Sequence, residues 1–181
     1  MDAKVGDTYL RNIVRNYRMY RQMAEKAIGQ VPSEEDLNRE LDKDSNSIAV
    51  IAKHVGGNLR SRFRDFLTSD GEKPDRNRDS EFETAGNVSR EQLLKWWSDG
   101  WDIAMASIEA LTAPDLARTV RIRDEEMLVV EALNRSVTHT AYHVGQIVYL
   151  ARHFASGNWQ TLSIPKGKSA EAQRGPGAGK R

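Results

Sequence analysis

The sequence predicts an all-α fold, a helical bundle in a single domain. Four long segments repeat their apolar residues with the 3.6-residue period of an α-helix. No segment alternates strictly between apolar and polar residues, as a half-exposed strand would. A chain of 181 residues fits one domain and is long enough to bury a core without disulfides or a structural metal.

The composition excludes several classes of protein. Apolar residues make up 39% of the chain and charged residues 29%, which is the balance of a water-soluble globular protein. No apolar run approaches the length that spans a bilayer, and the N-terminus lacks the pattern of a secretory signal, so we expect a cytoplasmic protein with no membrane partner. The absence of cysteine excludes disulfides, thiolate metal ligands and a cysteine nucleophile. His, Asp and Glu remain as good metal ligands.

The charge distribution gives no reason to expect a nucleic-acid partner. The chain has 27 Lys and Arg against 26 Asp and Glu, a formal net charge of +1. Arginines gather in two places: Arg11, Arg15 and Arg18, and Arg60, Arg62 and Arg64. Acidic residues are spread nearby, and no aromatic residues interleave to stack on bases. We interpret both groups as solvated or ion-paired surface.

Two helices are expected in the N-terminal half. The first covers residues 5–29 and ends at the Val-Pro pair 31–32, because the residue before proline disfavours the helical conformation. Its apolar stripe consists of Val5, Tyr9, Ile13, Tyr17, Tyr20, Ala24 and Ala27. The second covers residues 47–68, with an inward face made of Ile48, Ile51, Val55, Leu59, Phe63 and Phe66. A long polar loop follows at 69–88, and loops of this length are often lids or dimer contacts.

Two more helices are expected in the C-terminal half. Ser89 and Gln92 have the spacing of a capping box and start the third helix. Its buried face consists of Leu93, Leu94, Trp97, Trp101, Ala104, Met105, Ile108 and Leu111. Residues 118–123 fit a short extended segment that has no clear partner strand. The fourth helix runs from about Glu126 to Gly157, whose missing side chain suits the left-handed turn after a helix.

The C-terminal end of the chain differs in composition from the rest. Trp159, Leu162 and Ile164 are expected to pack against the helices. From residue 166 onward the chain is rich in Gly, Lys, Ser and Pro, which is typical of a flexible segment. We therefore expect a helical domain at 1–165 and a flexible basic tail at 166–181.

Two of the four histidines, His139 and His143, lie four residues apart in the fourth helix. This spacing directs both rings to the same side, about one turn apart, so both can bind one ion. The rings fall within the apolar stripe of that helix, which consists of Val129, Ala132, Ser136, Ile147, Leu150 and Phe154. Two buried imidazoles among aliphatic residues are costly unless each nitrogen has a partner. A divalent cation supplies that partner.

A third ligand has to come from another helix, and His54, near the middle of the second helix, is the candidate. Gly56 and Gly57 follow it. Because glycine costs roughly 1 kcal/mol in a helix interior relative to alanine, the pair indicates a close approach of a neighbouring helix or a local irregularity. Asn58 and Ser61 lie on nearly the same face and are candidates for polar lining or for hydrogen bonds to the ligands.

The fourth histidine does not belong to this candidate site, and a metal-free interpretation of the other three is also open. His153 lies about 15 Å beyond His143 along the helix, too far to share the ion. A lone histidine such as His54 is more often an ordinary, partly buried residue than a ligand. No carboxylate is clearly placed beside the three rings. The residues predict a metal site at His54, His139 and His143; the alternative is a metal-free dimerisation module whose histidines hydrogen-bond to buried polar groups.

Three stretches carry the histidines and part of the loop between them: residues 54–63 (HVGGNLRSRF), 70–74 (DGEKP) and 139–147 (HTAYHVGQI). They resemble the DinB-like superfamily, in a branch of uncharacterised proteins, and the resemblance extends to about residue 168. It implies a four-helix bundle with a long crossover connection, a divalent ion held by three histidines and frequently a homodimer. Other branches are metal-dependent thiol transferases or isomerases that use bacillithiol, mycothiol or glutathione.

Two classes of function follow from such a site. Three neutral imidazoles leave the charge of the ion uncompensated and at least one coordination position open, as in catalytic zinc sites. The first hypothesis is a metal-dependent transferase in which a low-molecular-weight thiol attacks a small electrophilic substrate, or a hydrolase that uses water. The resemblance alone favours the thiol. The second is a non-catalytic metal-binding or stress-related helical dimer protein. Histidine ligands suit Zn, Ni, Fe and Cu alike, and no catalytic residue is assigned.

Overall fold

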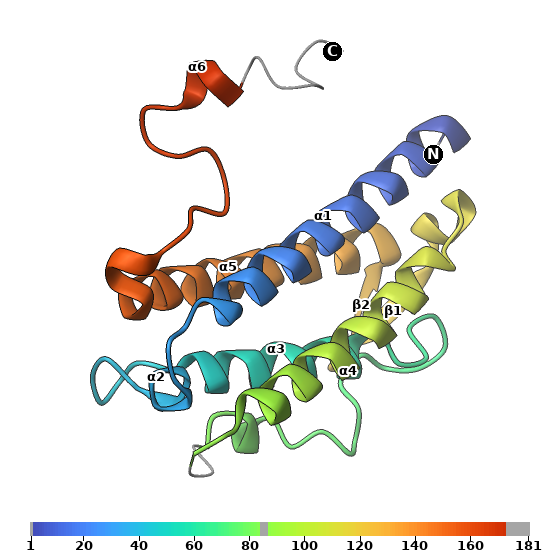
Figure 1. The fold of residues 1–181 in the computed structure, drawn as a ribbon. Helices are drawn as coiled ribbons and strands as arrows, with labels where there is room; N and C mark the ends of the chain where they lie inside the picture. Colours follow the sequence, from blue (N-terminus) through green and yellow to red (C-terminus); the bar gives the residue numbers. More distant parts are fainter. Residues whose placement is uncertain (1, 84–86, 173–181) are drawn as a thin grey trace.

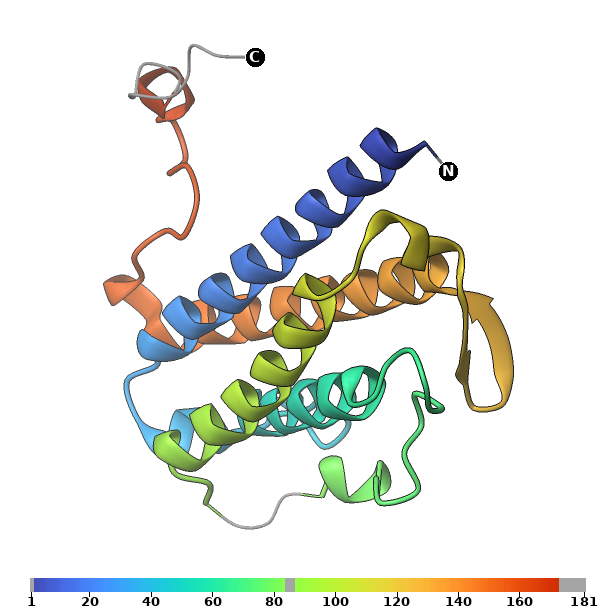
Figure 2. The same ribbon diagram turned by 90° about the vertical axis from the view of Figure 1, so that its right-hand side faces the viewer.

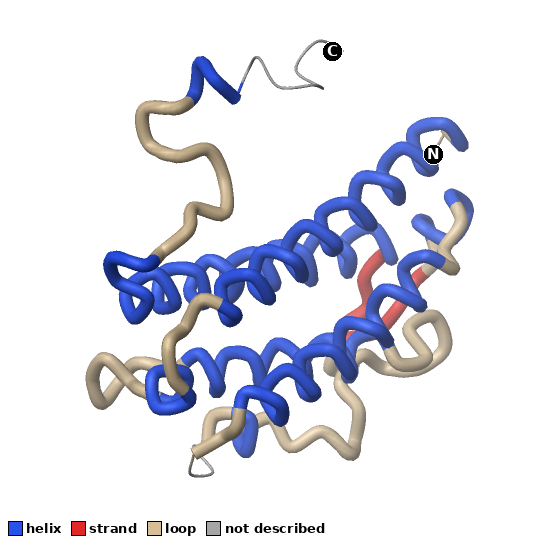
Figure 3. The backbone as a smooth tube through the Cα atoms, in the orientation of Figure 1, coloured by secondary structure: helices blue, strands red, loops and turns tan. Residues whose placement is uncertain are grey.

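The computed structural model describes residues 2–83 and 87–172, and this part of the chain is mostly helical (Figure 1). Its elements in order are α1 (Ala3–Gly29), α2 (Glu34–Asn38), α3 (Ile48–Phe63), the 3-10 turn η1 (Asp79–Glu81), α4 (Arg90–Glu109), η2 (Ala113–Ala117), β1 (Thr119–Ile122), β2 (Glu125–Leu128), α5 (Val129–Ala155), η3 (Ser156–Asn158) and α6 (Ser169–Ala172). The helical fold is as predicted. A small two-stranded sheet, red in Figure 3, departs from the all-α expectation.

Two of the long helices, α3 and α4, begin where the sequence supplies a capping serine. Ser47 Oγ accepts a hydrogen bond from the N–H of Val50 at 3.2 Å and starts α3. Ser89 Oγ accepts from the N–H of Gln92 at 3.2 Å and starts α4 at the predicted place. Each cap satisfies a backbone donor that the first helical turn leaves without an intrahelical partner.

The long helices share one core. Helix α1 lies along α5, and α3 packs against both α4 and α5 (Figures 1 and 2). Tyr17 of α1, Phe63 of α3 and Trp101 of α4 are all fully or almost fully buried. The ring of Tyr17 meets Trp101 and Phe63 edge-on, at centroid distances of 5.7 and 6.0 Å, an arrangement that aromatic quadrupoles favour. This cluster joins α1, α3 and α4 in one core.

Helices α3 and α4 approach each other closely at two glycines. A Cβ atom on Gly56 would overlap the carbonyl oxygen of Trp96, and one on Gly100 would overlap the carbonyl of Gly56. Only the absence of side chains at both positions permits this backbone contact. The close helix approach predicted from the glycine pair is therefore confirmed at Gly56.

The segment between α4 and α5 forms a β-hairpin. Strand β1 pairs antiparallel with β2, with Thr119 opposite Leu128 and Ile122 opposite Glu125. The extended segment predicted at 118–123 is thus present, but the expectation that it lacks a partner is wrong: its partner is the stretch that the sequence assigned to the start of the fourth helix. Residues 123–124, both with positive φ (58° and 62°), make the turn.

Several predicted boundaries are corrected. Helix α3 ends at Phe63 rather than near residue 68, because Arg64 is already extended (ψ 121°) and Asp65 has a left-handed φ of 52°. Helix α5 starts at Val129, after the hairpin, and the left-handed residue at its end is Ser156 (φ 49°) rather than Gly157. Val5, predicted to be on the buried stripe of α1, is 58% exposed. The short helix α2 was not predicted.

The C-terminal segment leaves the helices after η3 (Figure 1). Trp159 and Leu162 pack against the core as expected, whereas Ile164 is 52% exposed. Within the predicted tail, residues 169–172 form α6 and residues 173–181 lie outside the described residues. Among the described helices, none combines the length and the apolar character needed to cross a bilayer.

Candidate metal centre

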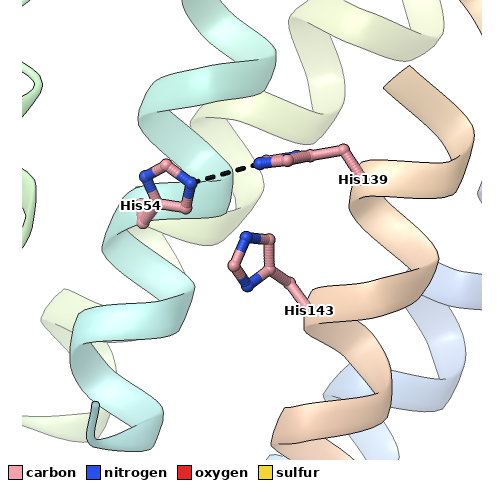
Figure 4. A group of neighbouring side chains, drawn as sticks. All are labelled: His54, His139 and His143. Carbon is pink, nitrogen blue, oxygen red and sulfur yellow. Dashed lines mark hydrogen bonds between the residues drawn. The ribbon is translucent and has the colours of Figure 1, made fainter. Parts of the chain in front are cut away.

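The structure brings His54, His139 and His143 together between α3 and α5 (Figure 4). Each ring offers one nitrogen, and these three atoms lie within 4.8 Å of one another. The Nε2 atoms of His54 and His139 are 3.3 Å apart, and the ring centroids of His139 and His143 are separated by 4.6 Å. His54 is buried and the other two are half-buried. Three nitrogen atoms converging in this way form a group that can hold a metal ion.

A carboxylate orients the ring of His54. Glu81, in η1, accepts a hydrogen bond from Nδ1 of His54 at 2.8 Å, and the side chains are 8% and 5% exposed. Because a carboxylate only accepts, the proton of the imidazole is on Nδ1 and the lone pair of Nε2 faces the other two histidines. This carboxylate–histidine arrangement is the usual support of a metal-binding imidazole.

The carboxylate of Glu81 is itself held in place by Arg76. The Nε and Nη2 atoms of Arg76 each donate to one oxygen of Glu81 at 2.8 Å. Burial alone would raise the pKa of Glu81, but the hydrogen bonds from Arg76 and His54 outweigh it and lower the pKa below its ordinary value. Glu81 is therefore ionised at neutral pH and keeps its acceptor role.

Gly57 makes room for that carboxylate. A Cβ atom at position 57 would overlap Oε1 of Glu81. The two glycines that follow His54 thus have different roles: Gly56 admits α4, and Gly57 admits the residue that orients His54.

Gln146 has the same role for His143. Its Oε1 atom accepts from Nδ1 of His143 at 2.7 Å, one turn further along α5. The proton is therefore on Nδ1, and Nε2 of His143 is available as a ligand atom.

The surroundings keep the rings of His139 and His143 neutral. Burial, followed by the proximity of His143, His54, Arg62 and Arg76, lowers the pKa of His139 to about 3. Burial also lowers the pKa of His143, partly offset by its hydrogen bond to Gln146. Neutral imidazole is the form that binds a metal, so both rings are ready to act as ligands at neutral pH.

Other residues singled out in the sequence have mixed outcomes. Asn58 lines the cavity beside His54, as expected of a polar lining residue. Ser61 instead holds the loop, because it donates to the carbonyl of Gly71 at 2.8 Å and accepts from the N–H of Lys73 at 3.1 Å. His153 is exposed near the end of α5, in contact with the ring of Phe154.

A cavity of about 220 Å³ opens beside the histidines. His54 and Asn58 line it from α3, and Ser136 and His139 line it from α5. A small molecule in this cavity would therefore meet the face of the histidine cluster.

Sequence reasoning missed Glu81, Arg76 and Gln146. Gln146 could have been found, because it lies three residues after His143 on the same helix face. Glu81 and Arg76 gave no such signal: they lie in the segment read as a plain polar loop, where no periodicity relates them to His54. The expectation that no carboxylate lies beside the rings is therefore corrected.

Comparison with known proteins gives a family for the chain. The model of the family described as "Protein of unknown function (DUF1572)" matches residues 4–168. Searches of curated proteins and of solved structures found no match. The matched range includes all three histidines as well as Glu81 and Gln146. Because the match covers most of its length, the chain belongs to the DUF1572 family.

Proposed function

We propose that this protein is a divalent-metal-binding protein of the DinB-like type that acts as a metal-dependent transferase using a low-molecular-weight thiol. His54, His139 and His143 are the proposed ligands. The observation that carries the proposal is the convergence of these three rings, two of which have their Nδ1 protons held by Glu81 and Gln146. Buried histidines that only form hydrogen bonds have no reason to direct their ring nitrogens toward one another.

The donor set fits a divalent ion. All three ligands are imidazoles, a donor that Zn, Ni and Fe accept. Within the described residues, no Asp, Glu or fourth His joins the group, so a bound ion would retain an open coordination position and its full charge. Glu81 accepts a hydrogen bond from Nδ1 of His54, the nitrogen directed away from the other two rings. Its carboxylate also accepts a hydrogen bond from Arg76. This arrangement supports a catalytic role over a purely structural one.

Such an ion supplies Lewis-acid chemistry, which lowers the pKa of a thiol or water so that it becomes a nucleophile at neutral pH. In the proposed reaction the sulfur of the thiol donates an electron pair to an electrophilic carbon of the second substrate and forms a C–S bond. The bond from that carbon to its leaving group breaks with the electron pair on the leaving group, and the thiol proton passes to the leaving group or to solvent. The protein contributes orientation of the ligands and a cavity that admits the substrates.

The architecture is consistent with this proposal. The four long helices α1, α3, α4 and α5 pack together, and the segment between α3 and α4, described at 64–83 and 87–89, is long and contains η1. We interpret this as a DinB-like four-helix bundle in which that segment is the long crossover connection. Glu81 lies in the crossover, so the connection would complete the site as well as join helices. A homodimer is part of the same proposal.

The second candidate is a protein that binds the ion without turnover. A closed coordination sphere or the lack of an entry path would favour it. The cavity lined by His54 and His139 argues instead for access of a small molecule to the cluster. Catalysis with water instead of a thiol would use the same ligands and cavity.

The test has two stages. Purified protein is first analysed for bound metal by elemental analysis, with H143A as the variant and H153A as the matched control on the same helix. We expect about one divalent ion per chain in the wild type and in H153A, and a large loss in H143A. Equal metal content in H143A and the wild type, or no metal after loading, would contradict the metal site.

The second stage tests the thiol. The cobalt-loaded protein is titrated with glutathione and with 2-mercaptoethanol, and its visible spectrum is recorded. A new sulfur-to-metal charge-transfer band is expected with at least one of them. An unchanged spectrum with every thiol tried would leave a metal-binding protein and remove the transferase.

A further inference from the structure

The cavity beside the histidines has a strongly basic lining. Five arginine side chains contribute to it, and no aspartate or glutamate is among its lining residues. They come from α3, from the crossover, from the hairpin turn and from α5: Arg62, Arg76, Arg78, Arg123 and Arg135. The whole chain has a net charge of only +1, so this concentration of cations is local.

Three of the cavity arginines share one carboxylate. Glu72 interacts with three guanidinium groups, those of Arg62 at 3.1 Å, Arg76 at 3.2 Å and Arg123 at 2.8 Å. Burial lowers the pKa of Arg62, and although Glu72 raises it, the nearby Arg76 and Arg123 lower it further. The net potential in this part of the cavity is therefore positive, which favours an anion.

Two arginines at the cavity have guanidinium N–H groups that no carboxylate of the described residues accepts at hydrogen-bonding distance. The side chains of Arg78 and Arg135 are 50% and 51% exposed. Their nearest carboxylates, on Asp79 and Glu125, are each 3.7 Å away, beyond hydrogen-bonding distance. In contrast, Arg76 is almost fully buried and bound to two glutamates.

Both of these arginines lie close to the histidines. The guanidinium of Arg78 stacks on the ring of Phe82 at 4.9 Å, and the centroid of that ring is 4.7 Å from the centroid of His54. Arg135 precedes His139 by one helical turn on α5, so their side chains emerge on neighbouring parts of the same face. An anion bound by this pair would lie beside the metal cluster rather than on a remote surface.

The cavity extends along α3 away from the histidine cluster. His54, Asn58 and Arg62 line it from successive turns of α3, which corresponds to roughly 12 Å along the helix axis. Its volume of about 220 Å³ suits a small molecule or one end of it, not a macromolecule.

We propose that the thiol used at this site carries an anionic group, a carboxylate or a phosphate, which Arg78 and Arg135 bind while its sulfur reaches the histidine cluster. The inference rests on the proposed function and names its cosubstrate class. The planar guanidinium groups suit both oxyanions, because each offers paired N–H donors.

The experiment compares thiols that differ only in their far end. Cobalt-loaded protein is titrated with 6-mercaptohexanoate, 6-mercaptohexylphosphonate and the neutral 6-mercaptohexan-1-ol, and dissociation constants are taken from the charge-transfer band. The variants are R78Q/R135Q and, as a control, R152Q, which removes one exposed arginine from α5 outside the cavity. The carboxylate and phosphonate compounds show which oxyanion the cavity prefers.

We expect at least one of the anionic thiols to bind about tenfold or more tightly than the alcohol in the wild type and in R152Q. In R78Q/R135Q this preference should fall to threefold or less, while the alcohol binds as before. Equal binding of the charged and neutral thiols by the wild type, or an undiminished preference in R78Q/R135Q, would overturn the anion site and leave the transferase standing. Failure of all three thiols to bind would overturn both.

Discussion

Glu81 accepts the Nδ1 proton of His54 at 2.8 Å from a position 27 residues further along the chain. This bond sets which nitrogen of His54 faces the other two rings. Since Glu81 lies in the connection between α3 and α4, the position of η1 and the orientation of the His54 ring depend on each other.

Replacing Glu81 by glutamine is expected to weaken metal binding by about 10- to 100-fold, the usual effect of losing such a supporting carboxylate. The neutral amide is a weaker acceptor, and it no longer compensates the charge of Arg76. Zinc affinity measured by competition with a chelator checks this, with E109Q, which removes a carboxylate from an exposed ion pair with Arg18, as the control. Unchanged affinity in a folded E81Q would show that Glu81 does not act on the ligand.

Replacing Gly57 by alanine should act through the same carboxylate, because the new Cβ would displace Glu81. We expect a loss of zinc affinity similar to that of E81Q. The double variant G57A/E81Q should lose little more than either single variant, since both changes remove one interaction. Additive losses would mean that Gly57 affects the site by another route.

Gln146 is expected to support His143 through its acceptor oxygen alone. Q146L removes the acceptor and should reduce zinc affinity about tenfold, whereas Q146E keeps an acceptor and should bind zinc at least as tightly as the wild type. Chelator competition on the three proteins makes the comparison. If Q146L and Q146E behaved alike, the hydrogen bond to His143 would have no part in binding.

The close contact of α3 with α4 predicts that replacing Gly56 by alanine changes the free energy of unfolding very differently from replacing Gly145. G56A places a methyl group against the Trp96 carbonyl and should lower the free energy of unfolding by about 3 kcal/mol or more, because backbone atoms have to move. G145A meets nothing within 4 Å in α5 and should stabilise the protein by up to about 1 kcal/mol. Urea unfolding of both variants measures the difference, and similar stabilities would contradict the close approach.

Asp70 joins the segment between α3 and α4 to the β-hairpin. Its carboxylate accepts from the backbone N–H groups of Arg123 and Asp124 at 2.9 Å and of Glu72 at 2.6 Å. Burial opposes ionisation, but these bonds lower the pKa of Asp70 below its ordinary value. The carboxylate therefore stabilises the fold above the pKa of the unfolded chain, near 4, and this contribution is lost as the pH falls through the lower folded pKa.

We accordingly expect D70N to be about 1–2 kcal/mol less stable than the wild type at pH 7, with the difference shrinking below pH 4. The control D75N removes the exposed ion pair with Arg64 and should destabilise the protein much less than D70N does. Unfolding free energies between pH 3 and 7 test this. A difference that grew on acidification would have the wrong sign for a carboxylate with a lowered pKa.

The turn of the β-hairpin depends on a residue that is distant in the sequence. Residues 123–124 form the turn, and both have positive φ. They are Arg and Asp rather than the Asn-Gly pair that is typical of such a turn. The backbone N–H groups of both residues are held by Asp70, 53 and 54 residues earlier in the sequence. No window of a few residues contains that information, and the local periodicity of the partner strand is compatible with the start of a helix.

The amino-acid order alone carries the helical periodicity, the caps at Ser47 and Ser89, and the placement of His139 and His143 on one face, because each depends on neighbours within a few residues. His54 follows from the sequence as the histidine near the middle of the second helix, and the resemblance of the three quoted stretches supports grouping it with the other two. The supporting carboxylate of Glu81, the arginine-lined cavity and the hairpin partner emerge from contacts between segments far apart in the chain. Such contacts depend on how the helices pack and where the connections cross, and this is why they become visible in three dimensions and not in the sequence.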